Sequence, residues 1–175
     1  MAAGRVSVTD YPARRLTIAV SASFEDFRQR YEAAVPRYDA AAFAALVERK
    51  AGWAEMLDLM NNSAPYGFLI YGTIDAQPLM SLAGDRAPCV AYLMGNHTIA
   101  ERMFRHDPRA LLYAPLRTVL TSGDDGGAQF CLDQPSQLFR SFDDPRITAV
   151  GVELDRKVAT LLEHLGAPVP SPLRG

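Results

Sequence analysis

The chain has too few cysteines and too short apolar runs for a disulfide-stapled or membrane protein. Its 175 residues include two cysteines, Cys89 and Cys131, and each stands in an apolar run typical of a strand. We therefore expect two thiols packed as small apolar groups rather than a disulfide or a redox pair. No stretch approaches the roughly 20 apolar residues that span a bilayer, and no apolar segment of the secretory type follows the first arginines. The sequence predicts a cytoplasmic protein with no membrane partner.

Charge and motif content exclude further classes. The formal net charge is -2 at pH 7, which argues against a general affinity for nucleic acid. The chain has no P-loop, no GxGxxG after a predicted strand and no GxSxG elbow, so nucleotide-dependent transfer and serine hydrolysis are not expected. It also lacks HExxH and paired CxxC motifs, and we predict no metal site and no cofactor.

Hydrophobic periodicity divides the chain into strands and helices. Leu16, Ile18 and Val20 alternate with small or polar residues, which is the period of a half-buried strand. The last helix is the best defined, because Asp144 stands as its N-cap and Gly166 just past its end. We predict strands over 15–21, 67–74, 89–94, 111–121 and 128–132, and helices over 23–35, 40–60, 98–105 and 145–165.

This order does not alternate as in a βαβ fold. It predicts an α+β class, in which a mostly antiparallel sheet packs against a long C-terminal helix and N-terminal helices. The length suits a single domain over residues 1–175. The two ends, about 1–12 and 168–175, are rich in proline, glycine and arginine, so we expect them to be frayed or loosely docked. Residues 122–127, Ser-Gly-Asp-Asp-Gly-Gly, predict a hairpin turn.

Three short motifs carry a resemblance to a known family. A strand ends in Gly95–Asn96, then Pro115–Leu116–Arg117 leads a strand into the hairpin, and Asp133–Gln134–Pro135 follows the return strand. The stretch from Cys89 to Phe139 thereby resembles the bacterial family called domain of unknown function 302. The resemblance implies a fold like that of the TATA-binding protein, with a curved antiparallel sheet around a long helix, and it suggests a homodimer. It implies no activity.

The chain departs from the family pattern in two places. After Gly-Asn the family usually has proline, where this chain has His97. The region 31–62 is also longer and more helical than the usual N-terminal half of the family. Related sheet-and-helix folds hold apolar ligands between sheet and helix, which is an analogy of fold alone.

The first candidate site is the segment 95–102, Gly-Asn-His-Thr-Ile-Ala-Glu-Arg. It stands at a predicted helix start, where free N–H groups favour an anion or a polarised carbonyl oxygen. His97 and Glu101 are four residues apart and share a helix face, so Glu101 would orient His97 as a general acid or base. Asn96 would help to fix a ligand's polar end. The alternative is a capped surface helix with an ordinary Glu–His contact.

The second candidate is one face of the predicted hairpin. Tyr113, Arg117 and Asp133 carry polar groups at alternate positions of the two strands. If this face is buried, Arg117 needs an acid beside it, and Asp133 is the nearest choice in sequence. The pair is then either a structural ion pair or an anchor for a ligand.

Aromatic residues such as Tyr71 and Tyr92 form the third candidate, because they suit either an apolar ligand pocket or the core. Two functions follow. One is a protein that binds a small apolar or carbonyl-containing molecule between sheet and helices. The other is a cofactor-free isomerase, cyclase or lyase that uses His97 in the same pocket. An interaction module without a pocket is a third possibility.

Overall fold

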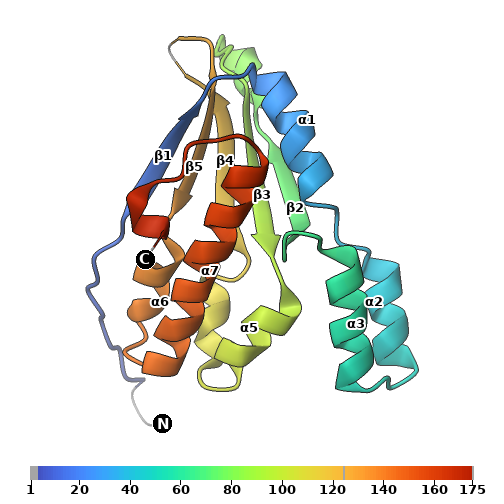
Figure 1. Ribbon diagram of the computed structural model, residues 1–175. Helices are drawn as coiled ribbons and strands as arrows, with labels where there is room; N and C mark the ends of the chain where they lie inside the picture. Colours follow the sequence, from blue (N-terminus) through green and yellow to red (C-terminus); the bar gives the residue numbers. More distant parts are fainter. Residues whose placement is uncertain (1–3, 124, 175) are drawn as a thin grey trace.

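The fold is an antiparallel sheet of five strands with helices against it (Figure 1). The computed structural model describes residues 4–123 and 125–174. The strands run in the order β1-β5-β4-β3-β2, and each neighbouring pair is antiparallel. The predicted α+β class with its antiparallel sheet is therefore confirmed. Their bounds are β1 Arg15–Val20, β2 Leu69–Asp75, β3 Cys89–Gly95, β4 Leu116–Ser122 and β5 Ala128–Asp133.

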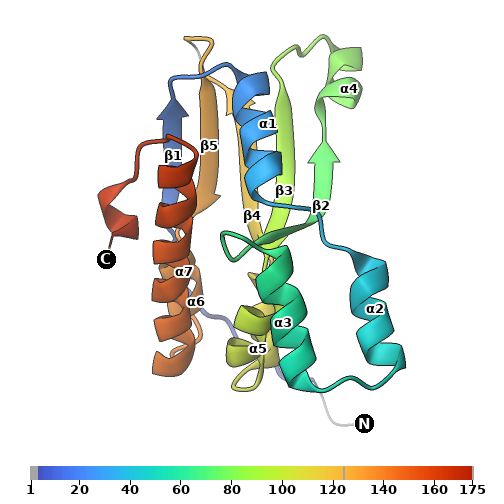
Figure 2. The ribbon, with the colours of Figure 1, turned by 45° about the vertical axis from the view of Figure 1, so that its right-hand side comes forward.

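The helices fall into two groups, as Figure 2 shows. The long α7 and the shorter α1 lie on the same face of the sheet, whereas α2 and α3 form an antiparallel pair beyond the N-terminal start of β2. We call this pair the α2–α3 hairpin. The bounds are α1 Phe24–Ala34, α2 Ala40–Glu48, α3 Trp53–Ser63, α4 Gln77–Met80, α5 His97–Phe104, α6 Pro135–Arg140 and α7 Pro145–His164.

The main core lies between the sheet and the helices α1 and α7. Alternate residues of β1 and β5, such as Ile18 and Phe130, are buried there, and the rings of Phe27 and Tyr31 from α1 pack onto Phe130. The predicted last helix is confirmed as α7, and its apolar residues at helical spacing, from Ile147 to Leu165, are buried against the sheet side. Side chains of the sheet and of the helices pack together in this space.

The second predicted helix is interrupted in the structure. We expected one helix from 40 to 60, and the structure has α2 and α3 joined by residues 49–52. Lys50 adopts a left-handed backbone conformation, with φ of 53°, and Gly52 then serves as the N-cap of α3. The apolar spacing looks continuous because both helices turn an apolar face to the same region.

Three smaller predictions also needed correction. Residues 111–121 are not one strand, because a 3-10 turn over Pro108–Leu112 precedes β4. The helix α5 begins at His97 rather than at Thr98, with Asn96 as its N-cap. The C-terminal segment is docked as far as Arg174, since Leu173 is buried and the carbonyl oxygen of Pro172 accepts a hydrogen bond from Gln134 Nε2 at 3.0 Å.

Three further predictions can be compared with the structure: the state of the cysteines, the hairpin turn and the absence of a membrane-spanning helix. Cys89 and Cys131 are free and half-buried. The predicted turn over 122–127 includes Asp124, which lies outside the described residues, and β4 pairs with β5 on either side of it. Among the helices over 4–123 and 125–174, none is long and apolar enough to cross a membrane.

Candidate functional site

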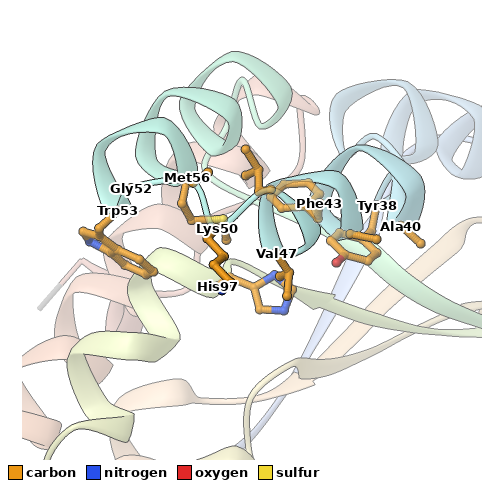
Figure 3. Close-up of a pocket in the computed structure, with 12 residues that line it drawn as sticks. Tyr38, Ala40, Phe43, Val47, Lys50, Gly52, Trp53, Met56 and His97 are labelled. Carbon is orange, nitrogen blue, oxygen red and sulfur yellow. The ribbon is translucent and has the colours of Figure 1, made fainter.

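A pocket of about 540 Å³ lies on the α2–α3 hairpin (Figure 3). The two helices and their connection form one side, and His97 at the start of α5 closes the other. Its lining is mostly apolar and includes Phe43, Val47, Trp53 and Met56. A volume of this size suits a small organic ligand.

Local sequence signals fix the two helices that frame this pocket. The carboxylate of Asp39 caps α2 by accepting the backbone N–H groups of Ala41 and Ala42, at 3.1 and 3.0 Å. At the start of α3, Glu55 Oε1 accepts the backbone N–H of Gly52 at 3.2 Å. Glu55 also pairs with Arg49 across the connection, at 2.6 Å. These contacts define the opening of the pocket.

Aromatic rings form the inner wall. Tyr38 stacks on Phe43 on one side and on Tyr71 on the other, with ring centroids 4.7 Å apart in both pairs. The ring of His97 meets Tyr71 edge to face at 4.8 Å and lies 5.4 Å from Tyr38. Such offset and edge contacts are favourable for aromatic groups. We call this group of rings the aromatic wall. It carries the phenol hydroxyls of Tyr38 and Tyr71 and the imidazole of His97.

A bulge in the edge strand positions Tyr71 in this wall. Ile70 pairs with Met94 and Gly72 pairs with Leu93, so Tyr71 is the extra residue between them. A bulge of this kind redirects a side chain, and bulges are common beside functional sites. The backbone of Ile70 also holds the segment before α2, because its oxygen accepts the N–H of Tyr38 at 2.9 Å. The two tyrosines are thereby brought to the same place.

His97, which lines the pocket, is paired with Tyr71, which lies outside the lining. The Tyr71 hydroxyl and His97 Nδ1 are 2.8 Å apart. Burial among the rings lowers the pKa of His97 below its ordinary value and raises the pKa of Tyr71 above its own. Both groups are therefore neutral near pH 7. When the phenol donates to Nδ1, the proton of the imidazole is on Nε2, where it serves as a donor to a ligand.

Glu101 does not take the role that we expected. Its carboxylate accepts a hydrogen bond from Arg105 Nε at 2.9 Å and pairs with the same guanidinium through its second oxygen. Arg105 lies one turn further along α5, so Glu101 turns away from the helix start. In the described structure the partner of His97 is Tyr71, and a phenol replaces the expected carboxylate.

Asn96 and Tyr92 are held by structural contacts. Asn96 Oδ1 accepts the backbone N–H of Thr98 at 2.9 Å, and its Nδ2 donates to the oxygen of Gly67 at 2.9 Å. Tyr92 is fully buried in the main core and donates to Glu32 Oε1 at 2.6 Å. Burial and this carboxylate raise the pKa of Tyr92. Neither side chain lines the pocket beside His97.

The hairpin residues of the second candidate lie elsewhere. Leu116 and Leu120 are buried against the helices, so Arg117 lies on the opposite face of β4 and is exposed. The condition for a buried Arg117–Asp133 pair is therefore not met, and Asp133 instead pairs with Arg15 at 3.3 Å. Arg117, Asp133 and Tyr113 do line a shared hollow of about 480 Å³. That hollow lies apart from the pocket at His97.

Sequence reasoning missed most of the pocket. Phe43, Val47 and Trp53 fall within the single helix that we predicted over 40–60, yet Val47 is 79% exposed and Trp53 47%. The signal available was Gly52, which interrupts the run of good helix formers just before Trp53. No three histidine, cysteine or acidic side chains come together as a possible metal site in residues 4–123 and 125–174.

The fold and site define a class: an α+β domain with an antiparallel sheet, a long C-terminal helix and an attached helical hairpin. The family described as "Domain of unknown function DUF302" matches residues 47–165. The chain belongs to the DUF302 family. Tyr71 and His97 lie within the matched range, whereas Tyr38 and Phe43 precede it.

A solved structure has the same fold. It is described as "Crystal structure of uncharacterized conserved protein DUF302 from Bacillus stearothermophilus" and aligns with a TM-score of 0.62. The match covers 86% of this chain and 97% of that chain at 16% sequence identity. This likeness establishes a shared fold and no shared activity. No curated protein matches the chain.

Proposed function

We propose that this protein binds a small, mainly apolar molecule in the α2–α3 pocket, with His97 and Tyr71 meeting the ligand's polar group. The observation that carries the proposal is the aromatic wall. Tyr38 and Phe43 stack on each other and line an unfilled volume of about 540 Å³, and Tyr71, which is not itself a lining residue, stacks on Tyr38. Apolar surface left exposed in this concave form is typical of a ligand site.

The chemistry of the pocket supports a ligand with an acceptor such as a carbonyl oxygen. His97 and Tyr71 are neutral near pH 7 because burial shifts both pKa values away from the charged forms. Once their shared hydrogen bond is made, the pair has one N–H or O–H left for a ligand. A flat, apolar molecule with one carbonyl group satisfies both the rings and this donor.

Native mass spectrometry and a fluorescent probe test the proposal together. Freshly purified protein would be measured before and after denaturing extraction, and then titrated with the neutral probe N-phenyl-1-naphthylamine. Ala44 lines the pocket from α2, so Ala44→Trp should fill it. Ala45 is exposed on the same helix outside the lining, so Ala45→Trp is the matched control. We expect about tenfold weaker probe binding in the first variant and little change in the second.

Either spectrum or titration can contradict this proposal. Equal probe affinity in wild type, Ala44→Trp and Ala45→Trp would mean that the probe does not enter the pocket. A co-purified organic mass that persists in Ala44→Trp would place any natural ligand elsewhere. A mass lost only in that variant would support the site and identify the ligand to be used in activity assays.

The hydrogen bond between His97 and Tyr71 favours a second candidate, a cofactor-free enzyme in the same pocket. A placed histidine that exchanges a proton with a substrate contributes typically ~10² to 10⁴-fold to a rate. Isomerisation, cyclisation or elimination on a carbonyl compound needs such a group. His97→Gln should then reduce turnover of the identified ligand by about 100-fold while binding persists. Equal turnover by His97→Gln and wild type would exclude this function.

The homodimer remains a prediction from the family resemblance. Native mass spectra recorded at micromolar concentration report the assembly directly. A dimer peak would support the prediction, and a spectrum of monomer alone would contradict it.

A further inference from the structure

Lys50 has an unusual backbone conformation for its side chain. Its φ is 53°, and Asp143 is the other non-glycine residue with positive φ in the described chain. A left-handed conformation disfavours residues with a Cβ, and aspartate tolerates it better than lysine does. Lysine at such a position therefore calls for an explanation in terms of its side chain.

The local hydrogen bonds show what this position normally holds. The N–H of Ala51 donates to the oxygen of Leu46 at 2.9 Å, and the N–H of Lys50 donates to the oxygen of Val47 at 3.1 Å. These two bonds make a Schellman motif that ends α2, with Lys50 in the left-handed position. Glycine is the usual residue there because it has no Cβ. The lysine thus lowers stability where glycine would not.

The side chain of Lys50 enters the pocket. Lys50 is among the lining residues, and Figure 3 shows its side chain running from the α2–α3 connection toward His97. It is the one lining residue with a fixed charge, and no carboxylate lines the pocket. Arg49 beside it is paired with Glu55, whereas Lys50 has no ion-pair partner among the described residues.

The remaining polar groups of the pocket also suit negative charge. His97 supplies a donor, and the first residues of α3, Gly52 and Trp53, line the pocket at the positive end of that helix. A charged ammonium group without a partner, beside an apolar wall, attracts a ligand with an anionic end.

We propose that the natural ligand of the α2–α3 pocket is a small apolar or aromatic acid, whose carboxylate or similar anionic group binds Lys50 while its rings or chain lie on the aromatic wall. This inference rests on the proposed function, because it assigns the ligand class of the same pocket. It also accounts for a lysine at a position where glycine is more stable.

Two probes with the same rings separate the contribution of charge to binding from the contribution of apolar burial. N-phenyl-1-naphthylamine is neutral, and 8-anilino-1-naphthalenesulfonate adds one sulfonate to the same anilinonaphthalene skeleton. Lys50→Gln removes the charge from the pocket. Arg86→Gln removes an equal charge from an exposed loop outside it and serves as the control. We expect Lys50→Gln to weaken the sulfonate probe about three- to tenfold, with little change for the neutral probe and none for either probe in Arg86→Gln.

Stability gives an independent readout of the same residue. Lys50→Gly should weaken the sulfonate probe as Lys50→Gln does, and it should raise the Tm by about 2 to 4 °C, as relief of roughly 1 kcal/mol of left-handed strain would in a chain of this size. Asp143→Gly changes the other left-handed residue and lies outside the pocket lining. It should leave both probe affinities unchanged.

The outcomes separate this inference from the proposed function. Neutral probe binding that Ala44→Trp abolishes, together with a sulfonate-specific loss in Lys50→Gln, supports both. The same neutral binding with equal effects of Lys50→Gln on the two probes overturns the acid ligand and leaves the pocket in place. Neutral probe binding that Ala44→Trp does not weaken overturns the pocket, and the acid ligand with it.

Discussion

The body of the molecule and its α2–α3 hairpin use aromatic rings in opposite ways. In the body, Tyr31 and Phe130 lie between sheet and helices with no exposed surface, as members of one large apolar core. The hairpin has a separate core of only four buried residues, Phe43, Met60, Ala64 and Leu69. There the rings of Tyr38 and His97 face an open volume. Packing fixes the fold in one region, and in the other the open aromatic surface is the place where we propose a ligand site.

A matched pair of truncations tests this contrast most strongly. Phe130→Ala removes a ring from the closed core, and we expect it to lower the free energy of unfolding by about 3 to 5 kcal/mol. Phe43→Ala removes the same ring from the small core beside the pocket, where Phe43 is buried but the surrounding core holds few residues. Its cost should be less, about 1 to 2 kcal/mol, with loss of probe binding. Urea denaturation and probe titration measure both effects.

Equal costs for the two phenylalanines would contradict the contrast. That result would mean that the hairpin core contributes to stability as the body does, and that the pocket is a flaw in packing. A large cost confined to Phe130, with probe binding kept in Phe43→Ala, would instead retain the stability contrast and remove the ring from the ligand site.

Polar groups in the two regions allow the same comparison, with smaller expected changes in the free energy of unfolding. In the body, buried Asp155 of α7 accepts hydrogen bonds from Gln134 Nε2 at 2.7 Å and from the N–H of Ser136 at 3.0 Å. Asp155→Ala leaves the buried N–H of Ser136 without its acceptor, whereas Gln134 Nε2 still has the hydroxyl of Ser136 at 2.9 Å and the oxygen of Pro172 at 3.0 Å. We therefore expect a loss of about 1 to 3 kcal/mol. In the hairpin, the exposed pair Arg49–Glu55 should contribute less than about 1 kcal/mol. Arg49→Ala and Asp155→Ala compared by urea denaturation check the difference.

The body could be predicted from sequence because its signals are local and repeated. The stripe of α7 continues through five turns of helix between a clear N-cap, Asp144, and Gly166. The strand β1 alternates without error from Leu16 to Val20. Each of these patterns predicts that one face of the helix or strand is buried. In the body, this burial is enough to fix where the element packs. The prediction that the strand begins at residue 111 was wrong because Leu111 and Leu112 are apolar yet exposed. Apolar identity alone does not separate a strand from a turn.

The pocket could be predicted only in part because it depends on contacts between distant segments. His97 was identified from its helix start, but its partner Tyr71 is 26 residues away and is directed by a bulge. Glu101 was the expected partner because the spacing of four residues is visible in sequence, and Arg105 is placed at the same spacing on its other side. The two departures from the family pattern, His97 and the helical region 31–62, are the segments that form the pocket.

The smallest expected effect is a pH dependence that belongs to the hairpin alone. Burial among the rings puts the pKa of His97 below its ordinary value of 6.5. The unfolded chain therefore binds a proton at this residue at a higher pH than the folded protein does, so the contribution of His97 to stability is complete above about pH 6.5 and is lost as pH falls through the folded pKa. Tyr38 and Tyr71 have raised pKa values and remain protonated throughout.

The measurement is urea denaturation of wild type and His97→Gln at steps from pH 7.5 to pH 5. Carboxylates elsewhere titrate equally in both proteins, so the difference between the two curves isolates His97. We expect wild type to lose stability relative to His97→Gln as pH falls, by a small amount because the ring is partly exposed. Parallel curves would mean that the aromatic wall does not desolvate the imidazole, and the neutral donor assigned to His97 at neutral pH would lose its basis.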